Sequence, residues 1–277
     1  MTGSTGGDGS VERFHEALRG RIGSFASTVR YHSKDGHICP ICGGPKPNSR
    51  DQLCFQCGKT REEARRQGYA GQLADTVRCN YYAFEGIQLG GLDQMYQIMK
   101  GYKRDFNDPW VVESYQTTLR YILADALIIH FDSIGELAGG TPPDVWTVIP
   151  SSITSRRHGQ RHPLSLLVEN LQLPIPEAIL VSQHEKLRVF DPDMFIVKDP
   201  DAVKGRRVLL IDDSWTTGNS IQSAAVALKR AGAAYVTVYC IARIINSSYW
   251  KEKNPAILQG FERMRYPHRD PFLITIL

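Results

Sequence analysis

The sequence has no long hydrophobic run. Its longest apolar stretch, residues 123–131, is broken by Asp125 and His130. It falls well short of the roughly 20 residues that a membrane-spanning helix needs. The amino-terminal MTGSTGGDGS lacks the apolar segment of a signal peptide and predicts a short flexible tail. We therefore expect neither a membrane span nor a secretion signal.

Cysteine is also scarce, with six residues in 277, and four of them fall within positions 39–57. Small secreted proteins held by disulfides use cysteine more densely, so the sequence favours a reduced, cytoplasmic protein. The rest of the composition is ordinary for a globular domain, with 42% hydrophobic and 22% charged residues. The net charge of +4 fits an anionic small substrate or weak contact with nucleic acid and does not choose between them.

The hydrophobic pattern changes along the chain. Apolar residues at helical spacing predict a helix over residues 11–29, with Ser10 as its N-cap. Residues 37–60 are rich in turn formers and have neither a helical nor a strand period. The charged run 61–66 predicts a short, solvated helix.

From about residue 81, short apolar segments alternate with longer amphipathic ones. The segments expected to form strands are 81–89, 145–149, 178–181, 208–212, 235–241 and, at the sheet edge, 274–277. The segments expected to form helices are 92–99, 112–134, 164–171 and 219–231. This alternation predicts an α/β fold in which a parallel sheet is covered by helices on both faces.

Two short motifs, CPICG and CFQCG, place four cysteines at the spacing of a metal site. The candidate ligands are Cys39, Cys42, Cys54 and Cys57. Two such pairs surround one Zn²⁺ tetrahedrally, and because the protein supplies all four ligands, the zinc would be structural rather than catalytic. Buried thiols or redox pairs are the alternative, but a thioredoxin-like motif needs a strand–helix–strand context that this segment lacks.

The segment VLLIDDSWTTGNS combines two acids with a loop suited to phosphate. Asp212 and Asp213 end an expected strand, at the edge where open α/β sheets bind ligands. The following residues open a helix whose amides and hydroxyls favour a phosphate: Thr216, Thr217, Gly218, Asn219 and Ser220. Carboxylates accept hydrogen bonds from a vicinal diol, so the two features fit opposite ends of one ribose 5-phosphate.

Two other interpretations of this segment are weaker. VLLIDD fits a Walker B strand, whose Asp holds Mg²⁺, but that function requires a G-x4-G-K-[ST] loop upstream. The only candidate, the GKT at 58–60, has Leu53 in place of the first glycine. A pair of capping acids before an ordinary turn is the other alternative, and the concentration of acids, threonines and glycine disfavours it.

The same segment resembles the 5-phosphoribosyl-1-pyrophosphate (PRPP) signature of type I phosphoribosyltransferases, in which two acids precede T-T-G-x-[ST]. The similarity continues through SAAVALKRAGA and YVTVYCIAR. A four-cysteine module ahead of such a domain resembles the ComF family of competence-associated, phosphoribosyltransferase-like proteins. QMYQIMKGYKR and VIPSSITSRRHG are also similar, so the resemblance covers about residues 37–245. The chain departs from the pattern at Ser214, Trp215 and Asn219, and reads RHGQRHP where Arg-Gly-Phe-Asn is expected near position 157.

In type I phosphoribosyltransferases PRPP binds with Mg²⁺, pyrophosphate leaves C1′, and a nitrogenous acceptor takes its place. The resemblance implies that Asp212 and Asp213 act as catalytic residues on the ribose hydroxyls, while residues 216–220 hold the 5-phosphate. The expected pyrophosphate-binding candidates, which follow two of the expected strands, are Ser151, Ser152, Arg156, Arg157, Arg161, Lys186 and Arg188. The expected cofactors are structural Zn²⁺ and Mg²⁺ held with the substrate.

The resemblance leaves a second function open. A ComF-like protein could bind PRPP, a nucleotide or single-stranded DNA without catalysis, in DNA uptake, recombination or regulation. Mutation of Lys100, Lys103 and Arg104 should then weaken DNA binding and leave PRPP binding unchanged.

The resemblance also sets the expected domain organisation, in which a type I phosphoribosyltransferase-like domain follows a helix and a small zinc-ribbon-like module. The expected boundaries are a tail and helix over 1–36, the zinc module over 37–70 and the large domain over 71–277. Within the large domain we expect a hood at about 75–110, a core at 111–245 and an extension at 246–277.

Overall fold

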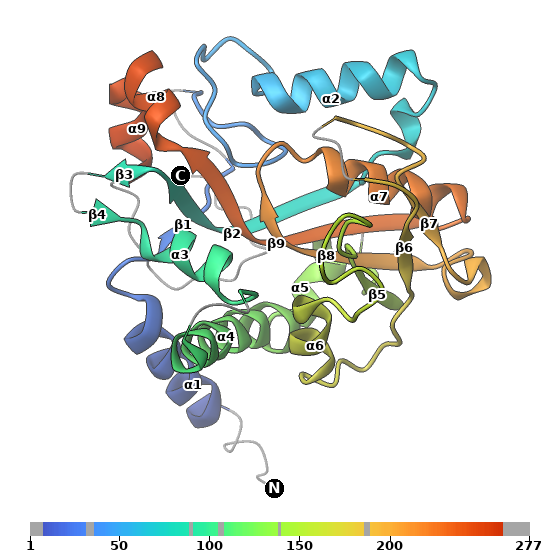
Figure 1. Cartoon of the computed structure of the whole chain (residues 1–277), viewed down its shortest axis with the longest axis horizontal. Coiled ribbons are helices and arrows are strands. Elements are labelled where there is room, and N and C mark those ends of the chain that lie inside the picture. Colours follow the sequence, from blue (N-terminus) through green and yellow to red (C-terminus); the bar gives the residue numbers. More distant parts are fainter. Residues whose placement is uncertain are drawn as a thin grey trace, which may run out of the picture.

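The computed structural model of the chain describes residues 8–31, 36–88, 91–104, 108–137, 140–185 and 189–262 (Figure 1). Several expectations fall outside these ranges: most of the flexible tail, the edge strand at 274–277, and two pyrophosphate-binding candidates, Lys186 and Arg188.

The centre of the molecule is a five-stranded sheet with the order β1-β2-β9-β8-β5. Its strands are β1 (Ser27–Thr28), β2 (Thr76–Glu85), β5 (Val145–Val148), β8 (Arg207–Trp215) and β9 (Tyr235–Asn246). β2, β9, β8 and β5 run parallel, and only the short β1 pairs antiparallel, with β2. The parallel α/β sheet predicted from the alternating pattern is therefore confirmed.

Helices cover both faces of this sheet. The main helices are α1 (Asp8–Ile22), α2 (Phe55–Arg66), α3 (Gln94–Gly101), α4 (Pro109–Ala124), α5 (Phe131–Leu137), α6 (Pro163–Glu169), α7 (Asn219–Arg230), α8 (Ser247–Lys253) and α9 (Pro255–Glu262). Shorter turns are η1 (Ala70–Gln72), η2 (Asp125–Ile129), which is π-helical, and η3 (Pro200–Ala202). Among the described helices, none is both long and apolar enough to cross a bilayer.

Two hydrophobic cores form because successive strand residues point to opposite faces. Leu209 and Ile211 of β8 pack with α1, α3, α4 and α6, whereas Val208 and Leu210 pack with α7 and the cysteine segment. Figure 1 shows α1, α4 and α6 on one side of the sheet and α2 and α7 on the other. Asp212 and Asp213 lie near the carboxyl end of β8, a strand that both helical layers flank.

The structure corrects the expected helix over 11–29. α1 begins at Asp8, so Ser10 lies inside the helix, and α1 ends at Ile22. Gly23 and Ser24, which are weaker helix formers than the preceding residues, follow that end. The chain then joins the sheet as β1, where the Val29 N–H donates to the Asn80 carbonyl. Pairing with a distant strand thus overrides the local helical spacing.

Other boundaries also differ from the sequence prediction. The helix expected over 112–134 is divided into α4, the π-helical turn η2 and α5. The charged helix expected over 61–66 begins earlier, at Phe55, directly after its N-cap residue Cys54. β2 begins at Thr76 instead of residue 81, and it falls within the range assigned to the hood although it lies in the main sheet.

The strand expected over 178–181 is displaced and belongs to a different sheet. β6 (Leu180–Ser182) pairs antiparallel with β7 (Phe195–Val197), which the sequence did not predict. Another small sheet joins β3 (Ile87–Gln88) and β4 (Gly91–Leu92). β8 and β9 run past their expected ends at residues 212 and 241, since Trp215 still pairs with Arg243.

Candidate ligand pocket and cysteine cluster

The acid pair lies in a pocket of about 320 Å³ at the carboxyl end of β8. Its lining brings together the two acids, the loop that opens α7, and residues of α3 and β2. The polar and charged lining residues are Glu85, Lys100, Lys103, His162, Asp212, Asp213, Ser214, Thr216, Thr217, Asn219 and Ser220. The sequence-predicted acids and phosphate loop are thus adjacent in space.

Asp213 is the buried member of the pair, with 5% of its surface exposed. Its Oδ2 accepts hydrogen bonds from Lys103 Nζ at 2.5 Å and from the Tyr102 hydroxyl at 2.8 Å. Its Oδ1 accepts from the Ser214 hydroxyl at 2.8 Å. Burial raises the pKa of Asp213, but the Lys103 ammonium and these hydrogen bonds outweigh it and hold that pKa well below its usual range.

We expect Lys103→Met to destabilise the protein by about 1–3 kcal/mol at pH 7, because it removes a charged donor from a buried carboxylate. The folded-state pKa of Asp213 is depressed, so the stabilisation is present above the unfolded-state pKa of about 3.9 and is lost as pH falls through the lower, folded-state value. The difference between the two proteins should therefore shrink below about pH 4. Urea unfolding at a series of pH values measures it.

Lys100→Met is the matched control, because Lys100 lines the same pocket and lies over the Tyr96 ring instead of on the acids. It should cost far less stability and show no acid-dependent change. Equal effects of the two substitutions would contradict a specific Lys103–Asp213 pair.

The phosphate-type loop has the backbone geometry that its sequence predicts. Gly218 adopts a left-handed φ of 84° and immediately precedes α7, whose first amides have no partner within the helix. The Thr217 hydroxyl accepts weakly from the Asn219 N–H at 3.4 Å. Thr216 is exposed, and Thr217 and Ser220 are half-buried. The dipole and amides of this 12-residue helix point at the pocket beside Asp212.

The side chains of two loop residues contact the rest of the protein. Trp215 is 1% exposed, and a Cβ built on Gly218 would lie 2.2 Å from its ring. Trp215 therefore packs beneath the loop and does not cover a ligand. The side chain of Asn219 accepts a hydrogen bond at 2.7 Å from the Thr60 hydroxyl of α2.

The loop between β5 and α6 carries the other predicted anion-binding residues. Ser151 and Arg157 line a second hollow of about 320 Å³, and Arg157 is also close enough to the acid site to act on the pKa of Lys103. Arg161 lines the same hollow and pairs with Glu177 at 2.8 Å and Glu169 at 2.9 Å.

The remaining two residues of that predicted set lie apart from the acid pair. The Ser152 hydroxyl hydrogen-bonds Thr154, and Arg156 is exposed. Three of the five described members of the set therefore line one hollow, while Ser152 and Arg156 line neither this hollow nor the pocket of the acid pair.

Sequence reasoning missed the lysines of the pocket. Lys100 and Lys103 belong to a basic run that could contact DNA, and nothing in their spacing ties them to an acid pair more than 100 positions later. His162, which also lines the pocket, caps α6: its Nδ1 accepts from the Leu164 N–H.

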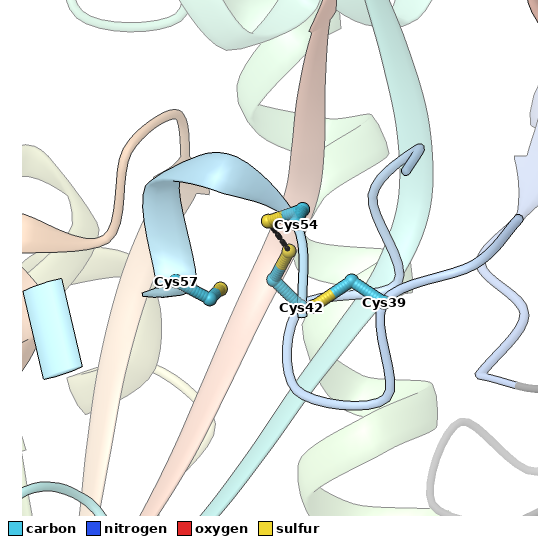
Figure 2. A group of neighbouring side chains, drawn as sticks. All are labelled: Cys39, Cys42, Cys54 and Cys57. Carbon is cyan, nitrogen blue, oxygen red and sulfur yellow. Dashed lines mark hydrogen bonds between the residues drawn. The ribbon is translucent and has the colours of Figure 1, made fainter. Parts of the chain in front are cut away.

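The four predicted cysteines form one buried cluster (Figure 2). Cys39 and Cys42 come from a loop, Cys54 directly precedes α2, and Cys57 lies in its first turn. The four sulfur atoms lie within 4.8 Å of one another, and the Cys42 and Cys54 sulfurs are 3.7 Å apart. Two thiolates on a tetrahedral ion with bonds of about 2.3 Å are about 3.8 Å apart. The cluster can therefore hold a metal ion such as zinc.

The two glycines that follow the cysteine pairs differ. Gly43 has a left-handed φ of 67°, and a Cβ there would lie 2.2 Å from Val29, so the first turn requires glycine. Gly58 instead lies within α2 with open space around its Cα. A tight turn at glycine therefore follows only the first cysteine pair, and the second pair lies at the start of a helix.

The cysteine cluster and the phosphate-type loop are joined by a buried arginine. The Arg243 guanidinium donates to the carbonyls of Trp215 and Thr216, both at 3.1 Å. Its other side packs against Gly44, where a Cβ would lie 2.5 Å from Nη2. Burial lowers the pKa of Arg243, but the neighbouring Cys42 and Cys54 sulfurs outweigh this and raise it. With the Thr60–Asn219 bond, this makes two polar links between cluster and loop.

A larger hollow, of about 730 Å³, lies between the cysteine segment and the start of β2. It contains neither acid of the pair nor residues 216–220. The chemistry expected of a sugar phosphate is gathered in the smaller pocket that contains the acid pair, so we assign the candidate site there.

No protein-family model matches the chain, and no curated protein matches it significantly. Among solved structures, a purine phosphoribosyltransferase from Pyrococcus horikoshii Ot3 is similar, at 20% identity and a TM-score of 0.29, over 47% of this chain and 73% of that one. An adenine phosphoribosyltransferase is similar at 17% identity and a TM-score of 0.33, over 52% and 78%.

A third similar structure is described as the allosteric regulatory enzyme of purine biosynthesis. The match has 20% identity and a TM-score of 0.27 and covers 43% of this chain but only 26% of that one. TM-scores this low do not establish a shared fold or function.

Proposed function

We propose that the protein binds PRPP with Mg²⁺ and transfers its phosphoribosyl group to a nitrogenous acceptor. The observation that carries the proposal is the placement of Asp212 beside the amino terminus of α7, in one pocket that also contains Lys100 and Lys103. One end of that pocket suits a diol and the other a phosphate.

Asp212 is the better candidate for the ribose hydroxyls. A carboxylate has about four lone-pair sites, and Asp213 already uses three of them on Lys103, Tyr102 and Ser214. Asp212 is half-buried and lines the pocket, and its Oδ1 accepts a hydrogen bond from the Asp213 N–H at 3.0 Å. We therefore assign hydroxyl binding mainly to Asp212. Asp213 instead holds Lys103 and the Ser214 hydroxyl near the carboxyl end of β8.

The 5-phosphate would lie on the loop that opens α7. Amides at a helix start and the positive end of the helix dipole favour an anion. Thr216, Thr217 and Ser220 add hydroxyl donors, whereas Asn219 contributes its main chain because its side chain is bonded to Thr60.

The pyrophosphate end requires cations around the departing charge. Of the predicted set, Arg157 is the best supported, because its charge reaches Lys103, and Lys100 joins it as a pocket cation. Arg161 is already neutralised by two glutamates and is the weakest candidate. Mg²⁺, bound by PRPP oxygens, would neutralise the departing pyrophosphate.

For the cysteine cluster we propose a structural Zn²⁺. Four thiolates around Zn²⁺ carry a net charge of −2, and a buried cation beside them offsets part of it. Arg243 lies in that position and binds the pocket loop at the same time. The zinc would thus fix the wall behind the phosphate-binding loop without contacting the substrate.

Release of pyrophosphate from Mg·PRPP in the presence of a panel of nitrogenous acceptors tests the transfer reaction. Base-dependent release by the wild type, abolished in Asp212→Asn, supports an enzyme. Asp212→Asn is preferred to Asp213→Asn because the latter would remove the charge that Lys103 pairs with. PRPP binding without release for any acceptor would contradict transfer and support a binding protein.

The single-stranded DNA alternative stays a prediction. Lys103 is engaged with Asp213, and Lys100 lines the same pocket, so these two lysines have a role in the proposed site without DNA. The cytoplasmic location and the domain boundaries at residues 36 and 70 likewise stay predictions.

A further inference from the structure

A second group of metal-type ligands lies on the opposite face of the sheet from the cysteines. His15 of α1, Asp125 at the start of the π-helical turn η2 and His130 directly after it bring their side-chain tips within 4.8 Å of one another. The Asp125 Oδ1 atom is 3.2 Å from His15 Nε2 and 3.6 Å from His130 Nε2. In the sequence, Asp125 and His130 stand out only as interruptions of an apolar run.

We propose that these three residues form a second metal site, for a divalent transition metal of the Zn²⁺ type. Imidazole and carboxylate ligands bind Zn²⁺ at about 2.0–2.2 Å, so two ligands of a tetrahedral ion lie about 3.4 Å apart. The two observed separations fall on either side of that value. The longer one exceeds an ordinary hydrogen-bond length.

The arrangement of the side chains also fits a metal site. Asp125 is fully buried, and a buried carboxylate is costly unless cations or donors surround it. The two imidazole rings lie parallel, with an interplanar angle of 6°, and both direct Nε2 at the same carboxylate oxygen. The side chains of both histidines remain 18% exposed, while their Nε2 atoms and the Asp125 oxygens are buried at the centre of the cluster. Three protein ligands and a water are a common zinc coordination.

The π-helical turn makes this convergence possible. In an α-helix, residues five apart point about 140° away from each other, since each residue turns the chain by about 100°. At η2 the His130 N–H bonds to the Asp125 carbonyl, five residues back, which widens the turn and brings the two side chains to one side. Such π turns occur frequently at functional sites.

A bound metal would connect α1 to η2. α1 packs against α4, and η2 continues α4 (Figure 1). α1 is otherwise held by the stack of Phe14 on Tyr121 and by Leu18 and Ile22 in the core. A metal at this site would therefore attach the amino-terminal helix α1 to the turn η2. It is independent of PRPP binding and of the cysteine cluster.

Metal content of the full-length chain tests the proposal. Metal-depleted protein is equilibrated with Zn²⁺ buffered below micromolar free concentration, and bound zinc is measured by elemental analysis. We expect two equivalents in the wild type and one in His15→Gln. The matched control is His184→Gln, which removes a histidine 3.2 Å from the carboxylate of Asp191 but outside any three-residue ligand cluster among the described residues. It should retain two equivalents.

Two further readouts separate this site from the cysteine cluster. Co²⁺ at four thiolates gives intense sulfur-to-metal charge-transfer absorption, whereas Co²⁺ at two histidines and a carboxylate does not, so His15→Gln should remove one Co²⁺ and leave that absorption unchanged. Zn²⁺ should raise the melting temperature of His15→Gln less than that of the wild type. One equivalent in the wild type, or two in His15→Gln, would overturn the proposal and leave an ordinary His–Asp–His ion-pair cluster.

Discussion

Replacing Gly218 with alanine is expected to abolish Mg·PRPP binding and to destabilise the fold strongly. The left-handed φ of 84° costs a non-glycine residue about 1–3 kcal/mol. The new Cβ would also lie 2.2 Å from the Trp215 ring, and overpacking of this kind adds about 1–3 kcal/mol. Because Trp215 is enclosed, the loop must move instead, and the amides at the start of α7 move with it. Urea unfolding and calorimetric titration measure the two effects.

Gly205→Ala is the matched control for this substitution. Gly205 has a similar φ of 71°, but a Cβ there meets nothing within 4 Å. Gly205→Ala should lose only the stability that the left-handed backbone costs a non-glycine residue, and it should bind Mg·PRPP as tightly as the wild type. If both variants lose the same stability and both keep the ligand, the close packing of Gly218 on Trp215 does not position the phosphate-binding loop.

Cys54→Ser is expected to have the second large effect, on both stability and ligand affinity. It removes one of four zinc ligands, and structural zinc in isolated zinc-finger peptides contributes about 10–16 kcal/mol to folding. Serine is a good N-cap for α2, so the helix itself should not suffer. Loss of the cluster would release Arg243 and Thr60, which hold the carbonyls of Trp215 and Thr216 and the side chain of Asn219. Mg·PRPP affinity should fall at least about tenfold, or about 1.4 kcal/mol.

The control for this prediction is Cys240→Ala, which removes a buried thiol that is not part of the cluster. It should lower stability modestly and leave both the zinc bound by the cysteine cluster and the PRPP affinity unchanged. Zinc chelation from the wild type should reproduce the Cys54→Ser phenotype. Retention of full PRPP affinity by folded, chelated protein would contradict the coupling between cluster and loop.

The parts of this structure that depend on local pattern could be predicted from the sequence. Alternating apolar strands and amphipathic helices indicated the parallel sheet, and the acid pair with its threonine–glycine loop fell at a strand-to-helix junction as expected. The four cysteines converge as their spacing indicates. In each case the residues that act together are close in the chain or carry a fixed spacing.

The parts that depend on distant contacts could not be predicted. The helical spacing beyond Ile22 gives way to pairing of β1 with β2, some 50 positions later. Lys103 finds Asp213 only in the folded chain. The hydrophobic spacing predicted one continuous helix over 112–134 and did not indicate the π-helical turn that aligns Asp125 with His130.

Calorimetric titration of Mg·PRPP into the zinc-loaded wild type and into Asp212→Asn tests the central claim most directly. The asparagine side chain keeps an oxygen that can accept the Asp213 N–H, so the substitution removes the charge and retains that hydrogen bond. Asp193→Asn, an exposed charge change outside the pocket, serves as control. The account predicts one site per chain in the wild type and in Asp193→Asn, weakened at least about tenfold in Asp212→Asn. No binding by the wild type, or equal binding by Asp212→Asn, would contradict it.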